Sequence, residues 1–280
     1  ATFEAAPEGF DLIWTMHARK RDKFFLAVVV FMAGNRAGLF PTADYDRVIV
    51  RLRQDPSLAN WSVSRIYSDY EISPRAALKL YFPAVEFRLC YFHKNQNLRK
   101  KAASLHLLTQ LIGPLLTCYR RLLVLPLLPP YLIPDAFYAI KADSPASADA
   151  LLDYHERTYI GSQNSAARFS PESWSIYSTT LNGDPRCNNS KESFHLQFGA
   201  VARCDLSRGR KVRPSRAVYA VQLEEEKVRQ DTAAPHNVAG VRGARKSAES
   251  EKNEKLKRVL LTPFTKYAAL LDQLSSVLRK

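Results

Sequence analysis

The segment Phe24–Met32 is a nearly unbroken apolar run with the length of a β-strand. A strand of this composition is typical of a sheet that is buried on both faces, since a half-exposed strand would alternate apolar and polar residues. The segment Asp11–His17 reads as a second strand, and the polar residues Ala18–Asp22 form a turn between the two. The sequence therefore predicts a sheet with helices on its faces.

Further strands and helices follow in alternation. Val85, Phe87 and Leu89 alternate with charged residues, which is the pattern of a half-buried strand. The other predicted elements are a helix capped by Thr42, a strand Trp61–Asp69, a helix begun by Ser73 and Pro74, and a basic helix Lys94–Lys101. With one more strand expected before Ala1, the order is β-β-β-α-β-α-β and then α, the order of a ribonuclease-H-like core.

The chain is strongly basic. Its formal net charge is +14, and residues 201–280 hold 18 Lys and Arg against 9 Asp and Glu. Such a charge favours a polyanionic partner, and nucleic acid is the usual one, although a basic tail can also be a solvated linker.

We interpret the Leu-rich stretch 105–133 as buried helices and turns rather than as a membrane span, because five prolines at or near it and Arg120-Arg121 interrupt it. Four scattered cysteines and the lack of a secretory signal favour an intracellular, reducing compartment.

Two carboxylates stand out as candidates for phosphodiester chemistry. Asp69 follows a predicted strand, so it lies at the carboxyl edge of the sheet, where sites of α/β proteins gather. Glu192 lies on a predicted helix whose apolar stripe is formed by Phe194, Phe198 and Val201. Each has a plainer interpretation, as a turn aspartate and as a solvated helix glutamate.

Four short blocks lie along the chain in a fixed order. They are Ala1-Thr2-Phe3-Glu4, Ser68-Asp69-Tyr70-Glu71, Cys90-Tyr91-Phe92-His93 and the stretch Arg186–His195, which contains Asn188-Asn189 and Glu192. In this order they resemble the catalytic domain of Mutator-like (MULE-type) DDE transposases. Phe82-Pro83, Gln96, Arg99-Lys100, Leu125–Pro129, Thr158-Tyr159-Ile160-Gly161 and Trp174 also match the family's pattern. Cys187 departs from it, since the family has threonine at this position.

The resemblance implies a fold, a domain organisation and an activity. The fold would be an α/β, ribonuclease-H-like mixed sheet flanked by helices, with an all-helical insertion and a helical C-terminal region. The domains would be residues 1–104 for the core, 105–170 for the insertion, 171–204 for the core helix bearing Glu192, and 205–280 for a basic linker and the C-terminal helices. The activity would be DNA cleavage and strand transfer, carried out in the nucleus on transposon ends and target DNA, with a homo-oligomer possible and no membrane.

The resemblance also assigns roles to individual residues. Asp69 and Glu192 would be catalytic and would bind Mg²⁺ or Mn²⁺, so we expect their carboxylates within roughly 12 Å of each other. Glu71, Cys90, His93, Asn188 and Asn189 would support them. Cys90 and His93 would brace a strand–helix junction; a zinc site completed by Cys187 and His195 is the weaker alternative. The basic residues that would contact DNA are Lys94, Arg99, Lys100 and Lys101.

The family's first catalytic aspartate would lie immediately before Ala1. Glu4 is out of register with it and is a poor substitute. We therefore expect the chain as given to be inactive, and to regain metal-dependent nicking when a strand ending in aspartate precedes Ala1. The alternative function is a catalytically dead, transposase-derived DNA-binding or chromatin protein.

Overall fold

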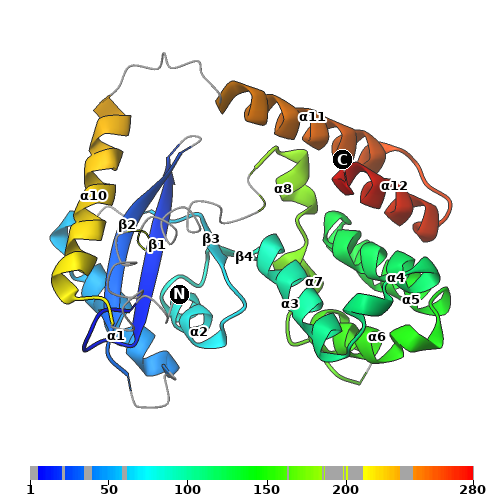
Figure 1. Cartoon of the computed structure of the whole chain (residues 1–280), viewed down its shortest axis with the longest axis horizontal. Coiled ribbons are helices and arrows are strands. Elements are labelled where there is room, and N and C mark those ends of the chain that lie inside the picture. The colour runs from blue at the N-terminus through cyan, green and yellow to red at the C-terminus, as the bar shows by residue number, and fades with distance from the viewer. Residues whose placement is uncertain are drawn as a thin grey trace. The chain divides into compact units, whose positions relative to one another are not determined.

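The computed structural model describes residues 6–20, 23–34, 40–58, 62–162, 164–184, 186, 198, 200, 211–233 and 242–279. These residues form an α/β structure in which helices predominate and the strands form two small sheets (Figure 1). The chain divides into two compact units. Unit 1 comprises residues 1–61, 72–83 and 188–238, and unit 2 comprises residues 62–71, 84–187 and 239–280, so the predicted 1–104 core contributes to both.

Unit 1 is built on an antiparallel hairpin. Strand β1 (Leu12–Lys20) pairs with β2 (Lys23–Met32), with a register shift between Met16 and His17. Leu12 pairs with Met32 and Ile13 with Phe31, so neighbouring pairs point to opposite faces.

Helices cover both faces of this hairpin, as its apolar sequence predicted. On one face, Leu12, Trp14 and Met32 pack with residues of α1 (Thr42–Arg53) and α2 (Ile72–Tyr81), and the Trp14 ring meets Tyr45 edge-on at 4.9 Å. On the other face, Ile13 packs with Ala217 and Ala220 of α10 (Pro214–Ala233), which runs beside the hairpin in Figure 1. The two small alanines allow close approach of α10 to the sheet.

Unit 2 contains the second sheet. Strands β3 (Arg65–Ser68) and β4 (Glu86–Leu89) are parallel, and Arg65 pairs with Glu86 and Ser68 with Leu89. Helix α3 (Tyr91–Ser104) follows β4 almost at once. Parallel pairing places the carboxyl ends of both strands at the same edge, which is where α3 begins.

The rest of unit 2 is helical. Its α-helices are α4 (Gly113–Val124), α5 (Ile133–Ala142), α6 (Asp149–His155), α7 (Pro171–Trp174), α8 (Tyr177–Leu181), α11 (Arg242–Leu261) and α12 (Tyr267–Arg279). Short 3₁₀ turns and a π-helical turn, η6 (Glu156–Ile160), connect them. Gly161 ends η6 with φ +83°, and a side chain there would meet the Ala167 amide at 2.8 Å, so this position requires glycine.

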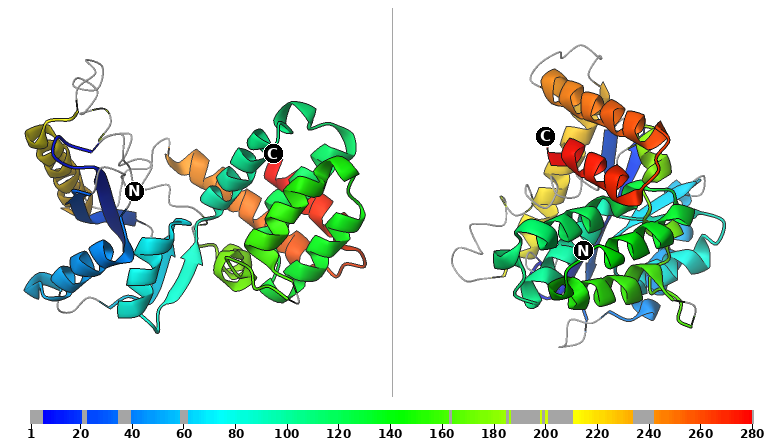
Figure 2. Two further views of the ribbon diagram at one scale, coloured as in Figure 1. Left: turned by 90° about the horizontal axis from the view of Figure 1, so that it is seen from below. Right: turned by 90° about the vertical axis from the view of Figure 1, so that its right-hand side faces the viewer.

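Helix α12 packs on α4 and α5, in red against green in Figure 2. Apolar residues of the three helices share one core that includes Leu122, Phe137 and Leu271. Arg121 of α4 joins them at the edge of this core: its Nε and Nη2 donate to the two carboxylate oxygens of Asp272, each at 2.9 Å, and its Nη1 donates to Asp143.

The described residues do not show one continuous sheet through all four strands. We expected Val28 and Leu89 in the same sheet, but Val28 lies in the β1–β2 pair and Leu89 in the β3–β4 pair. The physical reason is that, among the described residues, no strand hydrogen-bonds to both pairs.

One predicted helix is longer than expected. The helix after β4 extends beyond 94–101 at both ends. The predicted C-terminal helices include α11 and α12, which are separated by a turn containing Pro263. Prolines also break the Leu-rich stretch into short helices, as predicted. Within the described ranges, no helix is both long and apolar enough to cross a bilayer.

Candidate functional site

Asp69 follows the last residue of β3, at the carboxyl edge of the parallel pair. The Cys90 amide donates a hydrogen bond to the Ser68 carbonyl at 3.0 Å, which extends the pairing one residue beyond the end of β4. Cys90 is buried, has an extended backbone and precedes the first residue of α3. This bond therefore fixes the start of α3 beside Asp69.

His93 lies in the first turn of α3 and reaches the same edge. Its Nδ1 is 3.1 Å from Asp69 Oδ1, and the two side chains are 31% and 17% exposed. A carboxylate oxygen at this distance contacts the ring nitrogen and so restricts the orientation of the imidazole. The pair combines hard oxygen ligands with a proton-carrying group that solvent can still reach.

The other predicted site residues are only partly placed. Glu71 lies one residue before α2 and is partly exposed. Cys187, Asn188, Asn189, Glu192 and His195 lie outside the described residues. In the described part of the chain, no group of three or more His, Cys, Asp and Glu could hold a metal ion. Asp69 thus lies at the predicted strand end, while its role as a metal-binding carboxylate and its pairing with Glu192 stay predictions.

The predicted DNA-contacting residues of α3 divide into two groups. Arg99 and Lys100 are exposed, and Lys101 is half-buried with its Nζ 5.6 Å from the centre of the Tyr154 ring. Lys94, in contrast, is completely buried. A buried ammonium cannot reach a phosphate group in solvent, so Lys94 does not belong to a DNA-contacting surface.

Lys94 instead enters an aromatic cage. Its Nζ lies 4.8 Å from the centre of the Trp174 ring and 5.2 Å from that of Tyr159. The same nitrogen is 3.2 Å from His155 Nε2 and 3.4 Å from the Leu122 carbonyl oxygen, to which it donates. Burial lowers the pKa of Lys94 to about 7, and burial together with the nearby lysine lowers the pKa of His155 well below its ordinary value. His155 is therefore neutral at physiological pH.

The sequence does contain a signal for this burial. Lys94, Leu98 and Ala102 recur at intervals of four, and all three are buried on one face of α3. A count of basic residues along the helix ignores this periodicity, whereas a helical-wheel reading places Lys94 with the apolar residues.

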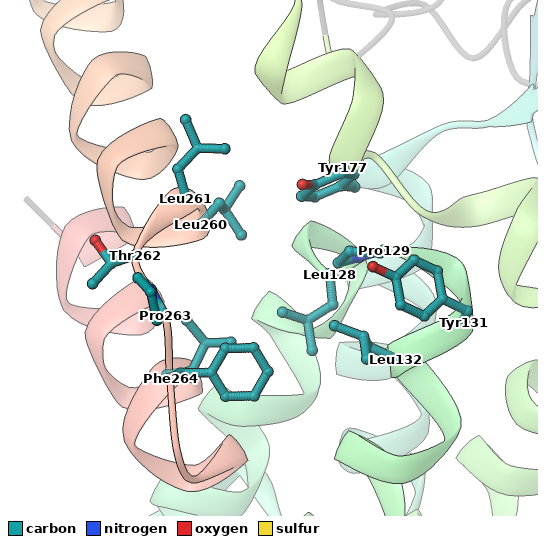
Figure 3. Close-up of a pocket in the computed structure, with 11 residues that line it drawn as sticks. Leu128, Pro129, Tyr131, Leu132, Tyr177, Leu260, Leu261, Thr262, Pro263 and Phe264 are labelled. Atoms are coloured by element: carbon teal, nitrogen blue, oxygen red, sulfur yellow. The ribbon is translucent and has the colours of Figure 1, made fainter.

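A second feature of unit 2 is a pocket of about 370 Å³ that is lined mainly by apolar residues (Figure 3). Leu260, Leu261 and Phe264 line one side of it, and Leu128 and Tyr177 lie on the opposite side. None of its eleven lining residues is charged. The pocket lining therefore has no carboxylate, imidazole or thiol, and the Asp69–His93 pair is the stronger candidate site.

No protein-family model, curated protein or solved structure matches this chain.

Proposed function

We propose that this chain is the catalytic region of a Mutator-like DDE transposase, a nuclear protein that binds DNA and uses Asp69 as one metal-binding carboxylate. The observation that carries the proposal is the position of Asp69 at the carboxyl edge of two parallel strands, 3.1 Å from His93. Asp69 and His93 lie 24 positions apart in sequence, yet their polar side chains contact each other.

The two strand pairs support a ribonuclease-H-like fold. Such a sheet joins an antiparallel pair to a parallel pair through one further strand between them. The β1–β2 pair is antiparallel and the β3–β4 pair is parallel, in the chain order that this fold requires. In this proposal, a strand that ends in the family's first aspartate completes the sheet.

The residues fit magnesium or manganese better than zinc. Asp69 offers hard carboxylate oxygens, which suit Mg²⁺, and Glu192 would supply a second carboxylate. A bound pair of divalent ions would stabilise the attacking and leaving oxygens of a phosphodiester. The protein would hold these carboxylates in place, and His93 would orient Asp69 through the contact between the two side chains. Arg99 and Lys100, both exposed on α3, would bind backbone phosphates.

The test is nicking of supercoiled plasmid DNA with Mg²⁺ or Mn²⁺. An extended chain, in which a strand ending in aspartate precedes Ala1, should nick the plasmid, and the chain as given should not. Asp69→Asn and Glu192→Gln in the extended chain should each abolish nicking. Asp153→Asn is the matched control, because Asp153 is an exposed aspartate of unit 2 paired with Lys141, and it should nick like the parent.

Two results would contradict the enzyme proposal. Nicking that survives Asp69→Asn would show that the site is elsewhere. Failure of every extended chain to nick, with DNA binding retained, would favour the alternative of a catalytically dead, transposase-derived DNA-binding protein.

A further inference from the structure

The buried lysine of α3 is an unusual element of unit 2. Lys94 has no exposed surface, and within the described residues it forms no ion pair with a carboxylate. Its partners are two aromatic faces, one imidazole and one backbone carbonyl, contributed by four elements other than its own helix. A buried amine without a carboxylate costs folding free energy, which its other contacts must offset.

The cage around Lys94 is itself held rigidly. The Trp174 indole Nε1 donates to the backbone carbonyls of Tyr159 and Phe169 at 3.2 and 3.0 Å. Tyr159 and Trp174 are both buried, and their ring centres lie 6.0 Å apart. The lysine amine therefore meets ring faces whose positions are fixed by the surrounding chain.

Two neighbouring pairs of residues connect this cage to the candidate site. Asp69 is followed by Tyr70, whose ring meets Tyr159 edge-on at 5.9 Å. His93 is followed by Lys94, whose amine lies over the face of the same Tyr159 ring. Asp69 and His93 are thus each followed in sequence by a residue that packs on Tyr159.

We propose that Lys94 is a positioning residue for the Asp69–His93 pair. The amine, held between Tyr159 and Trp174, sets the rotation of the first turn of α3, and this rotation directs His93 towards Asp69. Tyr70, packed edge-on against Tyr159, fixes the position of Asp69. The proposal deepens the proposed function and rests on it for the role of the pair in catalysis, but its test measures the geometry of the pair.

The discriminating variant is Lys94→Met. Methionine has a similar length, fills the cage with an apolar side chain and removes the amine, so the variant should fold. The readout is the NMR cross-peak of the His93 ring Cε1–H group, at one fixed pH, in protein with ¹³C-labelled histidine. The cross-peak is assigned by its loss in His93→Gln. Asp69→Asn gives the reference position of His93 without its carboxylate neighbour.

The expected result is that Lys94→Met moves the His93 cross-peak by at least half of the displacement caused by Asp69→Asn. Lys100→Met is the matched control, since it removes an exposed lysine from the same helix, and it should leave the cross-peak in place. Trp174→Phe keeps an aromatic ring but loses the indole donor, and it should cause a smaller displacement in the same direction.

An unchanged His93 cross-peak in a folded Lys94→Met protein would overturn the proposal. If Lys94→Met does not fold, an unchanged cross-peak in Trp174→Phe would do so. None of these NMR measurements uses DNA cleavage. The positioning role of Lys94 can therefore fail while the proposed function stands, and the proposed function can fail while the positioning role stands.

Discussion

Asp69 Oδ1 and His93 Nδ1 lie 3.1 Å apart at the edge where β3 and β4 both end. The hydrogen bond from the Cys90 amide to the Ser68 carbonyl brings their chain segments together, since it fixes the residue before Asp69 against the residue that precedes α3. Backbone pairing therefore brings both residues to the same edge of the sheet.

The buried lysine predicts an unusual dependence of stability on pH. The pKa of Lys94 falls from its ordinary value of 10.5 to about 7 on folding. Between these values the unfolded chain binds a proton that the folded chain does not, so the free energy of unfolding rises as the pH rises from about 7 to about 10.5, and the cost of burying the charge is fully present below pH 7. This rise in the free energy of unfolding is at most roughly 5 kcal/mol. The cation–π contacts with Tyr159 and Trp174 stabilise the charged amine and so reduce the rise by about 1–2 kcal/mol.

Urea denaturation at several pH values measures this effect. Lys94→Met should remove most of the rise and should be more stable than the parent near neutral pH, whereas Lys100→Met, which alters an exposed lysine, should retain the rise. Equal pH dependence in the parent and in Lys94→Met would refute the burial of an ionisable amine.

DNA binding should distinguish the exposed basic residues of α3 from the buried one. Each phosphate contact releases counterions, so Lys100→Ala should lower the slope of log affinity against log salt by about 1. Lys94→Met should leave the slope unchanged, because Lys94 is buried. Fluorescence anisotropy at a series of salt concentrations gives both slopes. A flat salt dependence for the parent would remove the basis for a phosphate-binding surface.

Arg121 should stabilise unit 2 more than an exposed ion pair would. It is 7% exposed and bonds to Asp272 of α12 and to Asp143, which follows α5. Arg121→Met should lower the free energy of unfolding by about 1–3 kcal/mol, because three helices lose a shared charged contact. Arg47→Met removes an exposed pair within α1 and should cost no more than about 0.5 kcal/mol. Urea denaturation followed by circular dichroism compares them, and equal costs would contradict the role of Arg121.

Local patterns predicted much of the secondary structure. The apolar run of β2 and the alternation of β4 identified both strands, and Asp69 lies at the strand end where its sequence placed it. These features depend on side-chain periodicity within a few residues, which a single sequence displays.

Long-range features could not be predicted in the same way. The separation of the strands into two sheets depends on hydrogen bonding between distant segments, which local patterns do not report. The contact between Lys94 and His155 joins residues 61 positions apart. Lys94 was misassigned because its charge outweighed its position on the buried stripe of α3, where residues 98 and 102 are apolar.

If Asp69 holds a divalent cation, as we propose, Mn²⁺ bound there broadens the NMR signals of nearby nuclei. Adding substoichiometric Mn²⁺ to protein with ¹³C-labelled histidine should broaden the His93 signal strongly. His106 is exposed and lies just after the end of α3, roughly 20 Å from His93 along the helix axis. Its signal should broaden far less. Asp69→Asn should abolish the selective broadening. A His93 signal that stays as sharp as that of His106, or that broadens equally in Asp69→Asn, would contradict a metal site at Asp69.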